Sequence, residues 1–322
     1  MKAIVIDAGA LRWDDVATPE PGVGEVRIKV QASAVNRADL VQRAGAYAPP
    51  PGASPILGLE CAGEIDAVGP EVVGFTPGEE VCALLAGGGY AEYVVVPAGQ
   101  VRRLPPGLTV TEAAAVPEVF ATAYLNLYLE AKATVGERFL IHAGASGVGT
   151  AAIQLGKLLS NPVAVTLSGE AKAQRCLALG AEAAFDRSEE GFWEAVGSWA
   201  GAGGVDVILD PVGGAYLENN MKVLAVDGRL VIIGLMGGAQ ASLALGPMMV
   251  KRQRVIGSTL RARSVAAKAA VMDALEQRLW PAFGSGALAP IVEATFPMAE
   301  ADAAHRLLAS NETVGKILLT LG

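Results

Sequence analysis

The feature that most constrains this fold is a glycine-rich turn in the middle of the chain. The apolar run 139–142 leads into the turn 143–149, and a helical pattern begins inside it. Such a turn lets backbone N–H groups approach a pyrophosphate at a helix N-terminus, where the helix dipole favours negative charge. The turn therefore predicts a dinucleotide-binding domain, with a second domain, mostly N-terminal to it, that supplies the substrate side.

Counted strictly, Gly144-x-Ser146-x-x-Gly149 departs from the dinucleotide fingerprint at its second position. The order of strand, turn and helix supports the interpretation more than the glycines alone. A phosphate-binding P-loop fails at Ala151, and a hydrolase elbow fails at Val148, because each motif needs glycine there. A tight turn without a ligand remains open, as does, more remotely, a hydrolase that uses a serine of the turn.

Two patterns of secondary structure divide the chain. Residues 1–117 contain short strands separated by Pro and Gly clusters, which is typical of a small antiparallel barrel or sandwich. In 118–260 strands alternate with helices, which predicts an α/β fold with a doubly wound parallel sheet. The tail 261–322 breaks that alternation, so we expect it to pack on the first domain after a helix stopped by Pro281. The expected parallel strands are 137–142, 162–166, 183–185, 205–209, 229–234 and 254–259, and the expected helices include 147–160, 172–179, 264–279 and 299–309.

Composition and charge limit the possible partners. The 322 residues carry a net charge of −8 without any block of like charges, which argues against nucleic acid. No run of about 18 apolar residues occurs, so we expect no membrane span. An acid at Asp7 favours a strand over a signal peptide at the N-terminus. Three scattered cysteines, Cys61, Cys82 and Cys176, are typical of reduced residues in a cytoplasmic protein.

The second strand of the parallel sheet distinguishes between the two nicotinamide cofactors. An acid at its end would bind the ribose 2′-OH, whereas a basic group would accept a 2′-phosphate. The strand instead leads into Ser168 and Gly169, and Glu170 is better placed to cap the next helix. Lys172 and Arg187 can direct positive charge at a 2′-phosphate, so the pattern favours NADPH. A solvated helix and loop surface remains the alternative for both cations.

Several segments resemble the medium-chain dehydrogenase/reductase superfamily over nearly the whole chain. These segments are 58–63, 77–81, 89–93, the glycine turn and 315–317. In the zinc alcohol dehydrogenases of that superfamily, a Cys and a His bind metal at the positions that hold Asn36 and Leu59 here. Those enzymes also have a segment with four closely spaced cysteines, which this chain lacks. Because zinc needs about four N, S or O ligands, we expect no catalytic zinc.

The zinc-free, zeta-crystallin-like quinone oxidoreductases fit best. Segments 33–40, 49–54, 141–144, 224–229 and 234–238 carry this resemblance, and they are most similar to a mammalian stress-induced member. The resemblance implies a Rossmann domain with a GroES-like barrel domain, NADPH-dependent transfer of hydride or electrons to a quinone without a metal, and a homodimer joined through the cofactor domains. The strand at 253–259 is expected at the sheet edge, where it could pair with a second copy.

Three residues of the first domain are candidates for the catalytic site. Asn36 can donate to a developing oxyanion. Tyr47 can stack on a flat acceptor and donate from its hydroxyl. Asp39 is expected to orient Asn36 or Arg37. A role in a helix N-cap is the alternative for Asn36, and an equal one for Asp39. An ordinary loop aromatic remains the alternative for Tyr47.

The expected cofactor contacts lie at the glycine turn, at the strand ends and near the C-terminus. Backbone N–H groups of the turn should bracket the pyrophosphate. The resemblance places Gly234 and the two residues after it against the nicotinamide, and Asn311 and Lys316 near the cofactor. The complete set is Gly144, Ser146, Gly147, Val148, Gly149, Ser168, Gly169, Lys172, Arg187, Gly234, Leu235, Met236, Asn311 and Lys316.

The two histidines and two other functions complete the predictions. His142 is expected to be a core histidine with satisfied hydrogen bonds, and His305 a helix surface residue. Reduction of enones or enoyl thioesters with NADPH is the second enzymatic hypothesis. A non-catalytic, crystallin-like NADPH-binding protein is the third, because a resemblance in fold does not fix the chemistry.

Overall fold

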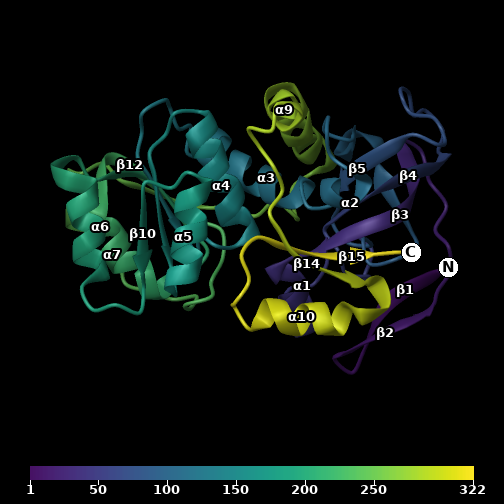
Figure 1. The fold of residues 1–322 in the computed structure, drawn as a ribbon, viewed down its shortest axis with the longest axis horizontal. Helices are drawn as coiled ribbons and strands as arrows, with labels where there is room; N and C mark the ends of the chain where they lie inside the picture. Colours follow the sequence, from purple (N-terminus) through teal and green to yellow (C-terminus); the bar gives the residue numbers. More distant parts are fainter. The chain divides into compact units, whose positions relative to one another are not determined.

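Two large sheets organise the chain, which the computed structural model describes over residues 1–322. Each sheet belongs to its own compact unit (Figure 1). The first unit comprises Met1–Ala121 and Leu260–Gly322, and the second comprises Thr122–Thr259. The domain boundaries that we expected, at 117/118 and 260/261, lie a few residues from these limits.

The second unit is a six-stranded parallel sheet with strand order β10-β9-β8-β11-β12-β13. All five residues of β9 are buried, as expected for a strand that is covered on both faces. The order reverses between β8 and β11, which is the topological switch point of a doubly wound sheet. The strands are β8 (Phe139–His142), β9 (Val163–Leu167), β10 (Ala183–Asp186), β11 (Val205–Asp210), β12 (Leu224–Ile232) and β13 (Arg254–Gly257). The predicted α/β class and all six predicted strands are confirmed, with β13 at the edge.

Helices cover the parallel sheet in two groups. The helix α4 packs against α5, whereas α6 packs against α7, and in Figure 1 the two pairs lie on opposite sides of the sheet. Helix α5 ends in a glycine cap, because Gly180 adopts a left-handed conformation with φ of 119°. The helices are α4 (Gly147–Leu158), α5 (Glu170–Leu179), α6 (Phe192–Ala200), α7 (Leu217–Val223) and α8 (Leu245–Val250).

The first unit, which contains both ends of the chain, is built on a seven-stranded sheet. Its order is β14-β15-β3-β4-β5-β7, and β6 also pairs with β3. The strands β1 and β2 form a separate antiparallel hairpin. The strands of this unit are β1 (Lys2–Asp7), β2 (Ala10–Asp15), β3 (Glu25–Val35), β4 (Glu60–Val68), β5 (Glu80–Leu84), β6 (Tyr93–Pro97), β7 (Val101–Arg103), β14 (Val292–Pro297) and β15 (Lys316–Thr320).

The long strand β3 is the centre of the first unit. It pairs with β4, β6 and β15, all antiparallel. Its inward residues Val26, Ile28 and Val30 are part of a core cluster that also includes Ile317 and Leu319 of β15. The tail therefore returns to the first unit, as expected from the break in the strand–helix alternation.

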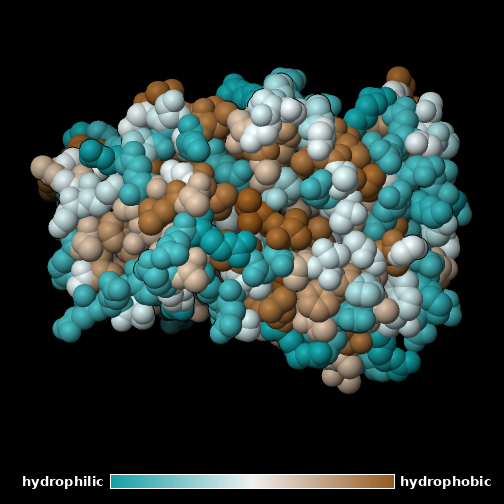
Figure 2. All heavy atoms as spheres, in the orientation of Figure 1, coloured by the Kyte–Doolittle hydropathy of each residue, from teal (hydrophilic) through white to brown (hydrophobic).

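Helices and turns connect the strands of the first unit, and helix α10 lies beside β14 and β15 (Figure 1). No helix is both long and apolar enough to cross a membrane. Figure 2 shows hydrophilic and hydrophobic residues interspersed over the visible face of both units. The remaining helices are α1 (Arg37–Arg43), α2 (Val110–Ala113), α3 (Pro117–Tyr124), α9 (Val265–Gly284) and α10 (Ala301–Ala309), with a π-helical turn at Leu125–Glu130.

The prediction that Pro281 stops the helix after residue 264 is wrong. Helix α9 runs through Pro281 and ends at Gly284. Proline lacks an N–H and weakens the helix around it. Here the last turn is held by packing, because Leu279 and Phe283 are buried and Trp280 donates from Nε1 to the carbonyl of Arg103 at 2.9 Å. Tertiary contacts thus outweigh the local preference.

Candidate functional site

The glycine turn of the second unit is too tightly packed to hold side chains at two of its positions. A Cβ on Gly144 would lie 2.3 Å from the Cβ of Val165 in β9. A Cβ on Gly149 would lie 2.3 Å from the carbonyl oxygen of Gly144. The first and third glycines of the motif therefore let helix α4 begin directly against the strands, as in dinucleotide-binding units.

The start of α4 offers backbone donors to an anion. The Ser146 hydroxyl caps the helix by accepting from the N–H of Gly149 at 3.0 Å. The N–H groups of Gly147 and Val148 are not used by the hydrogen bonds of the turn. Two such donors at the positive end of a twelve-residue helix form a suitable phosphate site. This is the geometry that the sequence predicts for the pyrophosphate.

The loop after β9 is held by an acid that the sequence analysis missed. The N–H of Gly169 donates to Asp186 at 2.6 Å, and the same carboxylate accepts from the N–H and hydroxyl of Ser188. These hydrogen bonds lower the pKa of Asp186. Lys172 lies in the first turn of α5 and Arg187 directly follows Asp186. Asp186 ends the third strand rather than the second, and its pairing opposite Leu167 became visible only in the fold.

A buried hydrogen-bond chain lies behind the glycine turn. His142 contacts the Thr166 hydroxyl through Nδ1 at 2.8 Å and the side-chain oxygen of Asn220 through Nε2 at 2.7 Å. The Asn220 amide then donates to Asp210 at 3.0 Å. Burial lowers the pKa of His142 and raises that of Asp210. The prediction that His142 is a satisfied core histidine is confirmed.

The Asp210 end of this hydrogen-bond chain supports the loop that the resemblance places against the nicotinamide. Asp210 accepts from the N–H groups of Val212 and Gly213 at 2.6 and 3.1 Å. The carbonyl of Val212 in turn accepts from the N–H of Gly237 at 2.7 Å. The loop holds Gly234 close to Pro211 and leaves Leu235 and Met236 exposed. Backbone contacts therefore fix the loop, and its apolar side chains face outward.

In the first unit, Asn36 belongs to a buried charged cluster. Its side-chain nitrogen donates to Glu60 at 2.9 Å and to the carbonyl of Ala34 at 3.2 Å. The Lys316 ammonium contacts Glu60 at 2.8 Å and the Asn36 side-chain oxygen at 2.7 Å. The second carboxylate oxygen of Glu60 accepts from the N–H of Glu118 at the start of α3 at 2.9 Å. Glu60 was not predicted as a site residue, although it follows directly on Leu59 in a segment that carries the resemblance.

The contacts of this cluster bear on two predicted roles. Both amide hydrogens of Asn36 already have acceptors, so donation to a substrate oxyanion requires an exchange of partners. The Lys316 ammonium donates to three oxygens, of which the third is the carbonyl of Val35 at 2.9 Å. A cofactor contact of Lys316 would likewise displace one of them. Both roles stay predictions.

The prediction that His305 lies on a helix surface is wrong. The residue is 2% exposed, and its Nε2 lies 3.2 Å from the Tyr90 hydroxyl. That hydroxyl donates to Asp39, which also accepts from the N–H groups of Asn36 and Gly58. Burial raises the pKa of Asp39 to about 6 and lowers that of His305 to about 4. The apolar face of α10 packs on the sheet and takes His305 inward.

Asp39 combines the two roles between which the sequence could not choose. Its carboxylate holds the backbone N–H of Asn36 at 2.8 Å, at the start of helix α1. It therefore orients Asn36 through the backbone and also stabilises the helix N-terminus. Arg37 points elsewhere, donating to the Asn311 side-chain oxygen at 2.6 Å. Asn311 has a left-handed φ of 59° just after α10.

Tyr47 lies in the loop after α1 and is half-buried. The guanidinium of Arg261 is 5.2 Å from the centre of its ring, within cation–π range. Burial raises the pKa of the Tyr47 phenol, whereas the positive charge of Arg261 acts in the opposite direction. Arg261 is thus a neighbour of a predicted catalytic residue that the sequence analysis did not single out.

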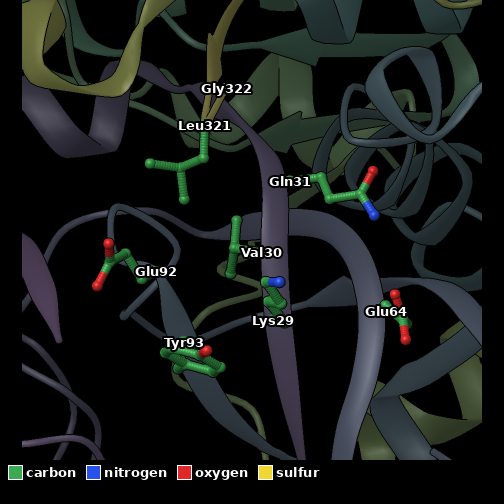
Figure 3. Close-up of a pocket in the computed structure, with 8 residues that line it drawn as sticks. All are labelled: Lys29, Val30, Gln31, Glu64, Glu92, Tyr93, Leu321 and Gly322. Atoms are coloured by element: carbon green, nitrogen blue, oxygen red, sulfur yellow. The ribbon is translucent and has the colours of Figure 1, made fainter. Parts of the chain in front are cut away.

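A groove of about 430 Å³ lies on the first unit, and its lining includes Lys29, Glu64 and Glu92. Figure 3 shows Glu92 on one side of it, and Gln31 and Glu64 on the other. The Glu92 carboxylate accepts from the N–H of Lys2 at 2.7 Å. No predicted site residue lines this groove. No group of three or more His, Cys, Asp or Glu side chains is placed to hold a metal ion.

Comparison with known proteins identifies the family. A model described as "Alcohol dehydrogenase GroES-like domain" matches residues 22–106, and one described as "Zinc-binding dehydrogenase" matches residues 179–319. The quinone oxidoreductase of Lama guanicoe is 32% identical over 95% of this chain and 92% of its own length. The chain belongs to the medium-chain dehydrogenase/reductase superfamily. Within it, this chain is similar to quinone oxidoreductases, as the resemblance predicted.

Other members of the superfamily differ in their named activity. A 2-haloacrylate reductase from a Burkholderia species is 31% identical over 95% of this chain and 94% of its own length. A mycocerosic acid synthase-like polyketide synthase of Mycobacterium tuberculosis is 33% identical, but the chain spans only 14% of its length. The solved quinone oxidoreductase of Thermus thermophilus, also determined with NADPH, is 34% identical with a TM-score of 0.83 over 100% of both chains. The family is therefore clear, and the acceptor varies within it.

Proposed function

We propose that this chain is a reductase that uses NADPH to reduce a quinone without a metal. The observation that carries the proposal is the pair of N–H donors of Gly147 and Val148 at the start of α4, in a superfamily member whose relatives include quinone oxidoreductases. NADPH supplies the hydride when bound, and the protein supplies binding, orientation and electrostatics. A quinone accepts hydride readily and needs little Lewis-acid help.

On this proposal the second unit holds the nucleotide by its backbone and by two cations. The turn at Gly144, Ser146 and Gly149 admits the pyrophosphate. Ser168, Gly169, Lys172 and Arg187 contact the adenosine ribose and its 2′-phosphate. The loop at Gly234, Leu235 and Met236 contacts the nicotinamide, and Asn311 and Lys316 add contacts near the cofactor. The hydrogen bonds of Asp186 stabilise its negative charge, so on this proposal Lys172 and Arg187 offset that charge as well as bind the 2′-phosphate.

The first unit supplies the groups that contact the acceptor. Tyr47 stacks on the flat ring and donates its hydroxyl hydrogen to the acceptor oxygen. Asn36 faces the acceptor or the nicotinamide from the buried cluster, and Asp39 holds the backbone of Asn36 in place. These roles rest on the geometry of the first unit together with the resemblance.

Reduction of an activated carbon–carbon double bond is the second candidate function. It is supported by the relative named 2-haloacrylate reductase. The test is NADPH oxidation, followed at the absorbance of the reduced nicotinamide, with a benzoquinone, an enoyl thioester and 2-chloroacrylate in parallel. We expect the quinone to have the highest kcat/KM. Faster reduction of either alkene would favour the second candidate, and NADPH binding without any turnover would favour a non-catalytic protein.

The role of Tyr47 is tested by Tyr47→Phe. We expect turnover of the quinone to fall roughly a hundredfold while the folded structure is kept, since the hydroxyl is lost and the ring remains. Tyr93→Phe, in a strand of the same unit, is the matched control and should leave turnover unchanged. Unchanged turnover in Tyr47→Phe would make Tyr47 an ordinary loop aromatic.

We also propose a cytoplasmic homodimer joined through the second units. The strand β13 leaves one edge of the parallel sheet unpaired, and the neighbouring helix α8 exposes Leu245, Met249 and Val250. The three cysteines are buried and unpaired, which suits a reducing compartment. Light scattering should give twice the mass of 32.9 kDa; the mass of one chain would reject the dimer.

A further inference from the structure

The guanidinium of Arg261 is buried and held by neutral acceptors. Its Nε donates to the carbonyl of Ala86 at 2.8 Å, and one Nη donates to the side-chain oxygen of Gln42 at 2.7 Å. The other Nη lies 3.4 Å from the carbonyl of Tyr47. The residue is only 3% exposed. These contacts connect the segment after β13 to helix α1 and to two loops of the first unit.

The partners of Arg261 fix its position firmly. Gln42 is 7% exposed and donates from its own amide to the carbonyl of Pro55 at 2.9 Å, which orients its oxygen toward Arg261. Lys268, in α9, donates to the carbonyl of Arg261 at 3.3 Å. The guanidinium therefore has a defined place, although no carboxylate is among its hydrogen-bond partners.

A buried cation that forms no ion pair is costly. Such a cation therefore stabilises a negative charge that develops close to it. Burial lowers the pKa of both Arg261 and Lys268, whereas Asp39 and Glu118 act on Arg261, and Glu118 on Lys268, in the opposite direction. The groups that face the Tyr47 phenol electrostatically are Arg261, which favours the ionised form, and Glu118, which opposes it. The centre of the Tyr47 ring lies 5.2 Å from the guanidinium of Arg261. This is the shortest distance among the three cation–π pairs of the structure.

We propose that Arg261 is a positioning residue for Tyr47, which holds the ring and its loop in place and stabilises the ionised phenol when Tyr47 gives its proton to the reduced acceptor. This inference rests on the proposed function. Arg261 acts through Tyr47 and does not itself contact the acceptor. The attraction between a cation and an aromatic face increases when the ring carries negative charge.

Hydride transfer and proton transfer together account for every atom and charge. The quinone gains a hydride from NADPH and becomes a hydroquinone monoanion, while the nucleotide is oxidised to NADP⁺. The O–H bond of Tyr47 breaks, and its proton forms a new O–H bond on the monoanion, which gives the neutral hydroquinone. The tyrosinate left behind takes a proton from a water molecule before the next turnover, and the hydroxide that remains is released to the solvent. Arg261 stays protonated throughout, since its pKa lies far above neutrality even when lowered.

The first test does not depend on turnover. Tyrosine labelled with ¹³C at Cζ reports ionisation of each of the six tyrosines by NMR, and Tyr47→Phe assigns the signal of Tyr47. We expect Arg261→Met to move the Tyr47 titration to higher pH, and Arg261→Lys to restore part of the shift because it keeps the charge. An unchanged Tyr47 titration in both variants would overturn the inference, even if the enzyme reduces quinones.

The second test asks whether the two residues act as a unit. We expect Arg261→Met to lower kcat for the quinone roughly tenfold with little change in KM for NADPH, and to cause no further loss in a Tyr47→Phe background. Equal losses in both backgrounds would show a merely structural role. If the wild-type chain reduces no quinone, the proposed function fails, while the NMR titration still decides whether Arg261 controls Tyr47.

The chain offers a matched control for a cation placed over a tyrosine. The guanidinium of Arg27 lies 5.7 Å from the ring centre of Tyr93, in the same unit, but it is paired with Asp66 and Glu20. Arg27→Met should leave both the Tyr47 titration and the turnover unchanged. A shift of Tyr47 in this variant would mean that any lost arginine alters the titration, which would overturn a specific role for Arg261.

Discussion

The two units each place a buried polar network next to their predicted functional residues, but the networks are built differently. In the first unit, Lys316 and Glu60 form an ion pair whose side chains are 4% and 0% exposed. In the second unit, the chain from Thr166 through His142 and Asn220 ends on Asp210, which accepts from backbone N–H groups. The first network fixes a charge, whereas the second fixes the path of the backbone.

The difference matches what each unit has to do. A unit that binds a nucleotide through backbone donors needs its strand ends and loops in register, and a hydrogen-bond chain connects Thr166 of β9 with the turn after β11. A unit that positions Asn36 needs a rigid polar side chain, and a buried ion pair orients it from two sides. The two designs predict different sensitivities to mutation, in the following order of size.

The largest effect is expected when the ion pair of the first unit is broken. Lys316→Met leaves the Glu60 carboxylate buried and unpaired, so the free energy of unfolding should fall by about 3–5 kcal/mol in urea denaturation. Lys222→Met, which removes an exposed partner of Glu218, is the control and should cost less than about 1 kcal/mol. If both variants cost the same, the buried pair is no more important than a surface pair.

A smaller loss of stability is expected when the hydrogen-bond chain of the second unit is interrupted. Asn220→Leu removes one hydrogen-bond partner from each of His142 and Asp210, which should lower the free energy of unfolding by about 1–3 kcal/mol and weaken NADPH binding, measured by calorimetry. Asn219→Leu, at the neighbouring position, should have little effect on either. Normal NADPH affinity in Asn220→Leu would separate the hydrogen-bond chain from the shape of the nucleotide site.

Next in size is an effect on cofactor choice alone. Lys172→Ala removes a cation from the first turn of α5, so the Kd for NADPH should rise roughly tenfold while that for NADH changes little. Lys157→Ala, in the last turn of α4, is the control. Equal losses for the two nucleotides would reject the 2′-phosphate role of Lys172.

The smallest effect is a pH dependence that arises within the first unit. The pKa of Asp39 is raised to about 6 in the folded protein, from about 3.8 in the unfolded chain. Protonation of Asp39 therefore stabilises the fold, and this contribution is complete below pH 3.8 and is lost as the pH rises through 6. His305 has a pKa lowered from 6.5 to about 4, so its contribution is present above 6.5 and is lost as the pH falls through 4. Between pH 4 and 6 the two slopes have opposite signs and partly cancel.

Separate variants should reveal these two slopes. In Asp39→Asn, stability should rise with pH between 4 and 6, because only the His305 contribution remains. In His305→Gln, stability should fall over the same interval. Urea midpoints measured at half-unit steps of pH check both signs, and parallel curves for the two variants would contradict the assignment.

Much of the fold could be predicted from local pattern. Continuous apolar runs such as that of β9 indicate strands buried on both faces, and the turn at Gly144 follows from the order of strand, glycine and helix. His142 could be placed in the core because it ends such a run. The bounds failed where packing outweighed propensity, as at Pro281, and the burial of His305 was missed because α10 buries a polar residue against Tyr90.

The site was harder to predict because its contacts join distant segments. Glu60 and Lys316 meet only because β15 pairs with β3, and β3 with β4. Arg261 contacts Tyr47 and Gln42, although all residues of the second unit lie between them in the sequence. Asp186 comes close to Gly169 through the parallel register of β9 and β10. Residue types near a motif could be named from the sequence, but their partners depend on strand pairing.

The strand order of the first unit also has a consequence for biosynthesis. Because β15 lies between β14 and β3, its sheet cannot close until residues 316–320 have left the ribosome, whereas residues 122–259 of the second unit have emerged before them. Vectorial synthesis therefore lets the nucleotide-binding half mature while, in the other half, residues 32–35 of β3 still lack their partner strand β15. During that interval the nascent chain exposes an open strand edge, and this is the stage at which a chaperone would be most useful.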